Sequence, residues 1–383
     1  MDDACKRCYQ SSFCNWNKKR TFLQVEQDFA PKWEKWRTRM KDIKPYLSIC
    51  IPTYNRSEVL KESLMQLLKY EGDDIEVVIS DNCSPDNTEE VVRGAADKRV
   101  RYYRNNYNNG GYNLISVLQH AQGKWAMLVS DEDSVYIENL KKIVALLKKN
   151  ESCGMVCASY YLYGNPYRVY EDERKMAGFE AVNRILFHTY MSGKIFNLDY
   201  VQREIGDLSE DEIKERYGIE YCWLELGHLL LSENDLITSS IVIANHRLQA
   251  YTDRTYANPY TPEGRAREAI DFLKNTNFPN FSKSDKCKLF FRILNWGVRE
   301  ATQGYAELVA EEHEAKKFDF TDKTALPDFE RAASEVSEKI VNAAIQLGYI
   351  QKEEIYEAIE YEEFKANVVN YIQKATEGCK NLI

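Results

Sequence analysis

Three consecutive acidic residues are the part of this sequence with the clearest capacity for chemistry. Asp131, Glu132 and Asp133 follow an apolar run, 125–129, that predicts a strand buried on both faces. Because burying uncompensated carboxylates is costly, we expect these acids at the exposed end of that strand. Carboxylates at i and i+2 of an extended chain project the same way, and their oxygen atoms suit Mg²⁺ or Mn²⁺. The alternative is a loop whose acids cap the next predicted helix, 137–149.

The chain before the triplet alternates between strand-like and helix-like segments. The predicted strands are 47–51, 75–80 and 100–103, and an amphipathic or turn-rich segment follows each of them. After the first strand, apolar residues at helical spacing predict a helix that Ser57 could cap. Alternation at this spacing predicts an α/β fold with a doubly wound, mostly parallel sheet.

Polar residues follow every predicted strand. The segment Pro52-Thr53-Tyr54-Asn55 follows the first strand, Asp81 ends the second, and an Asn/Gly-rich loop, 105–111, follows the third. The right-handed crossover rule places all these strand ends, with the acidic triplet, on one edge of the sheet. In open α/β sheets that edge forms the ligand crevice, so we expect one binding site there.

Composition and charge exclude several functional classes. The 383-residue chain has a formal net charge of −9, which argues against a protein that binds nucleic acid. No apolar run approaches the roughly 18 residues of a membrane-spanning helix, and the first residues do not resemble a signal peptide. The ten scattered cysteines predict reduced thiols in a cytoplasmic protein. Cys5, Cys8 and Cys14 could bind zinc, but no matching histidine or cysteine pair follows nearby.

Four motifs, taken together and in order, resemble a known family. They are L-S-I-C-I-P-T-Y-N-R (47–56), V-V-I-S-D-N-C-S-P-D-N-T (77–88), Y-Y-R-N-N-Y-N-N-G-G-Y-N (102–113) and A-Q-G-K-W-A-M-L-V-S-D-E-D (121–133). Their order and spacing resemble those of family-two glycosyltransferases, which have the GT-A fold, a nucleotide-binding α/β sandwich. The resemblance covers roughly residues 46–150. A weaker similarity, H-T-Y-M-S-G-K-I-F-N (188–197), is to the acceptor-side segment of bacterial polysaccharide members.

The resemblance implies roles for individual residues on the donor side. Asp81 would accept a hydrogen bond from the nucleobase, which favours UDP, dTDP or GDP over CDP because cytosine has no ring N–H there. Asp133 would bind a divalent cation, Mn²⁺ or Mg²⁺, and Asp131 would approach the ribose or the metal, while Glu132 between them would matter little. The remaining residues of the nucleotide-sugar site would be Pro52, Thr53, Tyr54, Asn55, Asn109, Gly110 and Gly111.

The resemblance also implies an inverting transfer, in which a carboxylate acts as general base on an acceptor hydroxyl. Ser192 and Gly193 resemble the turn that lines the acceptor. The candidates for the base are Asp199, Glu220 and Glu225, and Glu220 is favoured because many relatives carry paired acids at that place.

We expect four segments along the chain: an N-terminal extension (1–45), a nucleotide-sugar-binding half (46–150), an acceptor-binding half (151–264) and a C-terminal helical region (265–383). The last has apolar positions at helical spacing from Phe329 to Leu347, after the start signal Pro327-Asp328. Such faces serve either as core or as the seam of a homo-oligomer.

Together these features predict a cytoplasmic, metal-dependent glycosyltransferase of surface polysaccharide synthesis. Its partners would be a nucleotide diphosphate sugar and a glycan or lipid-linked acceptor, with peripheral membrane contact left open and no nucleic acid. One alternative is a sugar nucleotidyltransferase, although Pro52-Thr53-Tyr54-Asn55-Arg56 stands where such enzymes carry a Gly-rich loop. Another is a non-catalytic glycan-binding or scaffold protein, against which the intact acidic triplet argues.

Overall fold

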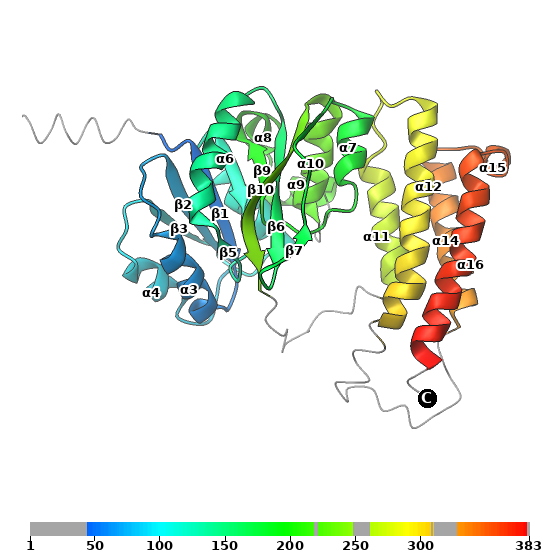
Figure 1. Ribbon diagram of the computed structural model, residues 1–383, viewed down its shortest axis with the longest axis horizontal. Coiled ribbons are helices and arrows are strands. Elements are labelled where there is room, and N and C mark those ends of the chain that lie inside the picture. Colours follow the sequence, from blue (N-terminus) through cyan, green and yellow to red (C-terminus); the bar gives the residue numbers. More distant parts are fainter. Residues whose placement is uncertain (1–43, 218–220, 248–260, 308, 310–327, 381–383) are drawn as a thin grey trace, which may run out of the picture. The chain divides into compact units, whose positions relative to one another are not determined.

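The first four strands of the chain run parallel to one another, and Figure 1 shows three of them, β1, β2 and β3, side by side. The computed structural model describes residues 44–217, 221–247, 261–307, 309 and 328–380, and residues 45–383 belong to one unit. In the described part, ten strands form one sheet in the order β3-β2-β1-β4-β9-β6-β10-β5, with β7 paired to β6 and β8 to β10. The parallel strands are β1 (Leu47–Thr53), β2 (Ile75–Asp81), β3 (Val100–Arg104) and β4 (Trp125–Leu128).

The second half of the sheet mixes directions. Strand β9 runs antiparallel to both β4 and β6, and it therefore joins the two parallel groups. Strand β10 is parallel to β6 but antiparallel to β5 and β8. The bounds are β5 (Ser134–Val135), β6 (Met155–Leu162), β7 (Asn165–Arg168), β8 (Glu173–Lys175), β9 (Lys194–Asn197) and β10 (Leu236–His246).

Register aligns the carboxyl ends of the parallel strands. Thr53 of β1 is opposite Asp81 of β2, and Asp81 is opposite Arg104 of β3. The polar residues that follow these strands therefore gather at one edge of the sheet.

Both faces of the sheet are covered by helices, because the strand residues are apolar on both sides. On one face Ile49 and Val77 pack in a core with α3 (Ser57–Leu67) and α6 (Ile137–Lys149). On the other face Cys50 and Val78 pack with α5, α7, α8 and α10. Further helices on the sheet are α4 (Thr88–Gly94), η1 (Gly110–Tyr112), α5 (Asn113–Gln119), α7 (Phe179–Ile185), α8 (Leu198–Ile205), α9 (Glu210–Tyr217) and α10 (Cys222–Glu233).

The C-terminal region is helical, and its apolar faces pack inward. Helices α12, α14 and α16 lie side by side in Figure 1, and Val298, Val336 and Ile340 belong to the same core as α10. Its bounds are α11 (Pro262–Asn275), α12 (Lys283–Arg299), η2 (Glu300–Gly304), α14 (Phe329–Gln346), α15 (Lys352–Ile355) and α16 (Ile359–Lys380). Asp328 caps α14 through the backbone N–H of Arg331, at the start that the sequence predicted.

The predicted fold class is confirmed: the molecule has an α/β sheet whose first four strands are parallel, followed by C-terminal helices. The predicted cap of α3 is wrong in detail. The helix begins at Ser57 itself, and the carboxylate of Asp86 accepts the Ser57 N–H at 2.8 Å. A distant side chain thus satisfies the helix end. None of the described helices has both the length and the apolar character required to cross a lipid bilayer.

Candidate functional site

The acidic triplet lies at the carboxyl end of β4, as the sequence predicted, but the expectation that this strand end is exposed is wrong. The chain turns directly after the strand, and the Asp133 N–H donates to the carbonyl of Ser130 at 3.1 Å. Asp131, Glu132 and Asp133 are all buried, with residue exposures of 4%, 4% and 1%. Buried carboxylates need partners, so their surroundings indicate what each of them does.

Asp133 is held by three side chains from two distant segments, the loop before β9 and the end of β10. Tyr190 and Ser192 donate their hydroxyls to its Oδ2, the latter at 2.5 Å. His246, the last residue of β10, places Nδ1 2.9 Å from Oδ1. These contacts fix the orientation of the Asp133 carboxylate before any ligand arrives.

Asp131 and Glu132 share one arginine. Asp131 accepts hydrogen bonds from the Thr53 hydroxyl at 2.8 Å and from Arg56 at 3.0 Å, and Arg56 also lies 3.3 Å from Glu132. Burial raises the pKa of the Asp131 carboxyl, and the Arg56 guanidinium opposes that rise. Arg247 adds a hydrogen bond to the carbonyl of Glu132 at 3.2 Å. The acid cluster is thus charge-compensated by arginines.

His246 is a residue of the site that sequence reasoning missed. Burial lowers its pKa, but the hydrogen bond to Asp133 and the charges of Asp133 and Glu132 outweigh that effect and raise the pKa above its ordinary value. The sequence signal was a lone histidine at the end of an apolar strand, a pattern that does not distinguish a ligand from a packed side chain.

A group with metal-binding character exists within the acid cluster. Glu132, Asp133 and His246 each offer one ligand atom, and the three atoms lie within 4.8 Å of one another. Two carboxylates and one imidazole fit a divalent cation such as Mn²⁺. The structure therefore brings Glu132 and His246 to Asp133, whereas Asp131, the other predicted ligand, is occupied by Thr53 and Arg56. The i, i+2 expectation assumed an extended chain, and the chain instead turns after β4.

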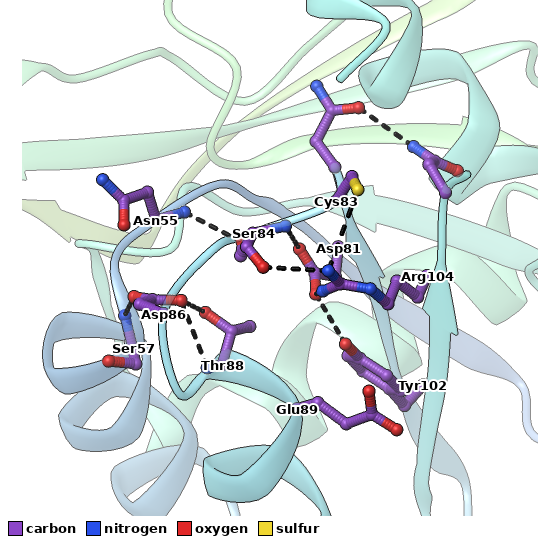
Figure 2. A network of polar contacts seen from close by, with 12 residues as sticks. Asn55, Ser57, Asp81, Cys83, Ser84, Asp86, Thr88, Glu89, Tyr102 and Arg104 are labelled. Carbon is purple, nitrogen blue, oxygen red and sulfur yellow. Dashed lines mark hydrogen bonds and ion pairs between the residues drawn. The ribbon is translucent and has the colours of Figure 1, made fainter. Parts of the chain in front are cut away.

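The second polar group of the crevice surrounds Asp81 at the end of β2 (Figure 2). Its fully buried carboxylate accepts hydrogen bonds from the Ser84 N–H at 2.8 Å, the Tyr102 hydroxyl at 2.5 Å and Arg104 at 2.7 Å. Burial and the bond to Asp81 raise the pKa of Tyr102. The Arg104 guanidinium compensates the charge of Asp81.

Asn82 connects β2 to the Asn/Gly-rich loop. Its side chain donates to Asn108 and to the carbonyl of Gly110, and it accepts from Asn105 and from the N–H of Asn109. Gly110 has φ +63°, in the left-handed region that glycine adopts without strain. The loop that was predicted to approach the donor is therefore held against β2 by one amide side chain.

The predicted nucleotide segment after β1 is only partly exposed. Pro52 and Thr53 are buried strand residues, and 43% of Tyr54 is exposed. Asn55 has φ +54°, and its N–H donates to Ser84 at 2.9 Å. Ser84 thereby joins this turn to the Asp81 group, as Figure 2 shows.

Of the two residues predicted to line the acceptor site, Ser192 lies at the acid cluster. It donates to Asp133 and accepts the N–H of Ser130 at 2.9 Å. Gly193 has φ +83°, and a Cβ there would lie 3.0 Å from Ile243 and 3.2 Å from a backbone oxygen. This turn brings the predicted acceptor segment next to the candidate metal ligands.

The three predicted base candidates are in different situations. Glu220 lies outside the described residues. Asp199 is exposed and lies 3.6 Å from Lys124, which precedes β4, so it is at the opposite end of that strand from the acid cluster. Glu225 is buried in α10, where burial raises its pKa to about 9, and a carboxyl that holds its proton at neutral pH cannot accept another.

Comparison with known proteins shows similarity in sequence and in fold. Residues 48–203 match the family model described as glycosyl transferase family 2, which confirms the predicted resemblance for that part of the chain. The structure is similar to the crystal structure of S. aureus TarS 1–349 in complex with UDP-GlcNAc, with a TM-score of 0.56. The similarity covers 88% of this chain and 91% of that chain, at 15% sequence identity. At this identity the similarity shows the fold, which is that of TarS.

Curated relatives match only part of the chain. The GalNAc(5)-diNAcBac-PP-undecaprenol beta-1,3-glucosyltransferase of Campylobacter jejuni is 32% identical over 95 residues, 24% of this chain and 31% of the relative. The abequosyltransferase RfbV of Salmonella typhimurium is 32% identical over 126 residues, 29% of this chain and 38% of the relative. The chain thus matches about a third of the length of these relatives.

Proposed function

We propose that the protein is a glycosyltransferase that moves a sugar from a nucleotide diphosphate donor to a glycan or lipid-linked glycan. The observation that carries the proposal is the convergence of the acid cluster, Asp81 and the Asn82-held loop at the carboxyl ends of adjacent parallel strands. The match of residues 48–203 to glycosyl transferase family 2 supports the same conclusion.

A divalent cation, Mn²⁺ or Mg²⁺, would be held by Asp133, Glu132 and His246. When bound, it would supply positive charge to neutralise the departing nucleoside diphosphate. The side chains of this chain do the orienting: Tyr190 and Ser192 fix one oxygen of Asp133, and His246 faces the other. Arg56 keeps Asp131 beside Thr53, where Asp131 would face the ribose.

The nucleobase would lie between Asp81 and the turn that contains Tyr54. Asp81 accepts one backbone N–H and one phenol in addition to Arg104, so one lone-pair direction on its Oδ1 remains for a ring N–H of the base. This geometry favours UDP, dTDP or GDP over CDP. Pro52, Asn55, Asn109, Gly110 and Gly111 complete the proposed donor site.

Glu220 would be the general base that takes the proton of the acceptor hydroxyl in an inverting displacement. Support comes from helix α10, which begins at Cys222, two residues after Glu220 in the sequence. The Cys222 thiol donates to the carbonyl of Gly111 at 3.2 Å, so the start of α10 lies beside the proposed donor loop. The test compares two substitutions. Glu220→Gln is expected to lower the transfer rate by about 100-fold or more, whereas Glu225→Gln leaves it within about twofold. Equal losses in both variants, or none in Glu220→Gln, would exclude Glu220 as the base.

The acceptor class follows from the relatives, whose names place two of them in the assembly of glycans: one acts on an undecaprenol-diphosphate-linked oligosaccharide and one transfers abequose. We infer an acceptor of this general kind, in surface polysaccharide synthesis at the cytoplasmic side of the membrane.

The proposal is tested by thermal unfolding with UDP, GDP, dTDP, CDP and ADP, each with and without Mn²⁺. A ligand at 100 times its dissociation constant stabilises the folded state by about 2.7 kcal/mol, which is visible as a melting shift. We expect a Mn²⁺-dependent shift with UDP, dTDP or GDP and a smaller one with CDP. If none of the nucleotides stabilises the protein, the donor site is not where we place it.

A further inference from the structure

A pocket outside the sites described above lies where α6 meets β6 and β10. This α6–β10 pocket has a volume of about 450 Å³, within the range of about 300 to 1,000 Å³ that is common for small-molecule sites. It is lined by Tyr136, Glu138 and Lys142 at the start of α6, by Tyr161 of β6, and by the segment 240–242 of β10.

Two tyrosines form an aromatic corner in the pocket. The rings of Tyr136 and Tyr161 are 6.2 Å apart between centroids and are inclined by 78°. In the described part of the chain, neither hydroxyl has a hydrogen bond to another residue. A ring that packs against one tyrosine would therefore meet a free phenol at the edge of the other, and tyrosine suits such half-apolar contacts.

The charged groups of the pocket balance each other. Glu138 contributes a carboxylate, and Lys142 contributes an ammonium group. One of the three N–H groups of Lys142 donates to the side-chain oxygen of Asn139 at 2.9 Å. A wall with one acid and one base does not select a phosphate or another anion. It offers both acceptors and donors to an uncharged ligand that carries several hydroxyls, and a sugar ring combines such hydroxyls with an apolar face.

The pocket is built on fixed backbone. The Tyr136 N–H donates to the carbonyl of Ile243 at 2.9 Å, and the Asn139 amide donates to the carbonyl of Val242 at 2.8 Å. The pairing of β10 with β6 shifts register between Ser239 and Val242, which is the irregularity of a β-bulge. Bulges are frequent beside functional sites, because they redirect side chains.

The pocket is close to the acid cluster along the chain. Tyr136 is three residues from Asp133, so their Cα atoms are at most about 11 Å apart even in a fully extended chain. Val242 lies on the same strand as His246, and β5, between Asp133 and Tyr136, pairs with that strand at Ala244 and Asn245. A glycan whose reacting hydroxyl is at the acid cluster can therefore extend into the pocket.

We propose that the α6–β10 pocket is a sugar subsite that holds an uncharged ring of the acceptor glycan other than the ring that is modified. The assignment rests on the proposed glycosyltransferase function and deepens it, because it gives the acceptor a neutral sugar next to its reacting one. Specificity for that sugar would come from Tyr136, Tyr161, Glu138 and Lys142.

The test measures sugar binding directly, without turnover. Methyl glycosides of glucose, galactose, N-acetylglucosamine and N-acetylgalactosamine are titrated against the full chain by saturation-transfer NMR, in the presence of diamagnetic Mg²⁺ and the nucleotide that gives the largest melting shift. Tyr161→Ala is expected to weaken the best-binding glycoside by about 3- to 10-fold, because it removes one aromatic contact. The matched control is Tyr356→Ala, which should leave binding unchanged. Tyr356 lies in the C-terminal region, away from the pocket, and is 63% exposed.

Lys142→Ala provides a second variant at an exposed position, in case Tyr161→Ala fails to fold. Loss of glycoside binding in either pocket variant but not in Tyr356→Ala supports the subsite. Equal binding in all variants, or no glycoside binding to the wild-type chain, overturns it. The nucleotide-induced melting shift is measured on the same samples, so failure of the donor site is recognised separately from failure of the pocket.

Discussion

Glutamate and histidine occur together in two buried places of this molecule, with opposite electrostatic results. In the acid cluster, His246 faces Asp133 and Glu132, and its pKa is raised. In α10, burial raises the pKa of Glu225 to about 9 and lowers that of His228 to about 3. The carboxylates of the first place favour the charged form of the histidine, whereas burial in the second place favours the neutral form of both groups.

The difference comes from partners rather than from residue type. Asp133 has two hydroxyl donors and an imidazole, and Asp131 has a hydroxyl and a guanidinium. Glu225 packs in α10 against α11, and its Oε2 has no hydrogen-bond partner among the described residues. A buried titratable group therefore indicates a ligand site only when its neighbours stabilise the charged form.

The largest effect is expected from a substitution in the acid cluster. Asp133→Asn keeps the shape of the side chain but removes the charge that would hold a cation, so donor hydrolysis and sugar transfer should fall by about 100-fold or more. The Mn²⁺-dependent part of the nucleotide melting shift should disappear as well. Asp199→Asn, at an exposed acid, serves as the control. Hydrolysis that survives in Asp133→Asn would remove the metal assignment.

A smaller effect is expected from the groups that orient Asp133. Tyr190→Phe deletes one hydroxyl donor to Oδ2, and loss of such a contact to a metal ligand typically costs about 10- to 100-fold in metal affinity. Calorimetric titration with Mn²⁺ in the presence of nucleotide measures it. Tyr167→Phe is the matched control, since that tyrosine is 62% exposed. Unchanged Mn²⁺ affinity would mean that Ser192 and His246 are sufficient.

The smallest effect is expected for Glu225 in α10, and it should change the free energy of unfolding rather than the transfer activity. Since the pKa of Glu225 is about 9 in the folded chain and 4.5 is its ordinary value, the folded state keeps a proton that the unfolded state loses between these values. Raising the pH therefore lowers the free energy of unfolding in this window, by up to about 1.4 kcal/mol per pH unit. Glu225→Gln should remove that slope.

Urea unfolding between about pH 7 and pH 8.5 avoids the lowered pKa of His228, which affects stability mainly below its ordinary value of 6.5. His246, whose pKa is raised, adds a slope of the same sign, so the contribution of Glu225 is the difference in slope between the wild-type chain and Glu225→Gln. Glu353→Gln, at an exposed position, is the control that should keep the slope. A slope that persists in Glu225→Gln would mean that Glu225 is ionised in the folded chain.

Local patterns in the sequence were sufficient for the first four strands, for the helix 137–149 and for the position of the acidic triplet, but not for strands β5 to β10. The parallel order then followed from the alternation of elements, and it brought Asp81 and the triplet to one edge. These features depend on residues within a few positions of one another, which a single sequence displays directly.

The partners of Asp133 could not be found in this way. Tyr190 is 57 residues from Asp133 and His246 is 113 residues away, and each is an isolated polar residue in its own segment. The choice between Asp131 and Glu132 beside Asp133 depended on a turn after β4, whereas the prediction assumed an extended chain. Glu225 was a base candidate because the sequence does not reveal its packing against α11.

The side-chain amide of Asn82 has a thermodynamic consequence for the Asn/Gly-rich loop, 105–111. Because Asn82 bonds to Asn105, Asn108, Asn109 and Gly110, the ordering of this loop is part of the folding free energy and not of the binding free energy. If a nucleotide binds there as proposed, it would meet a preorganised surface and lose less conformational entropy on association. Asn82 would therefore raise the affinity for a ligand by ordering the loop during folding, without contacting the ligand itself.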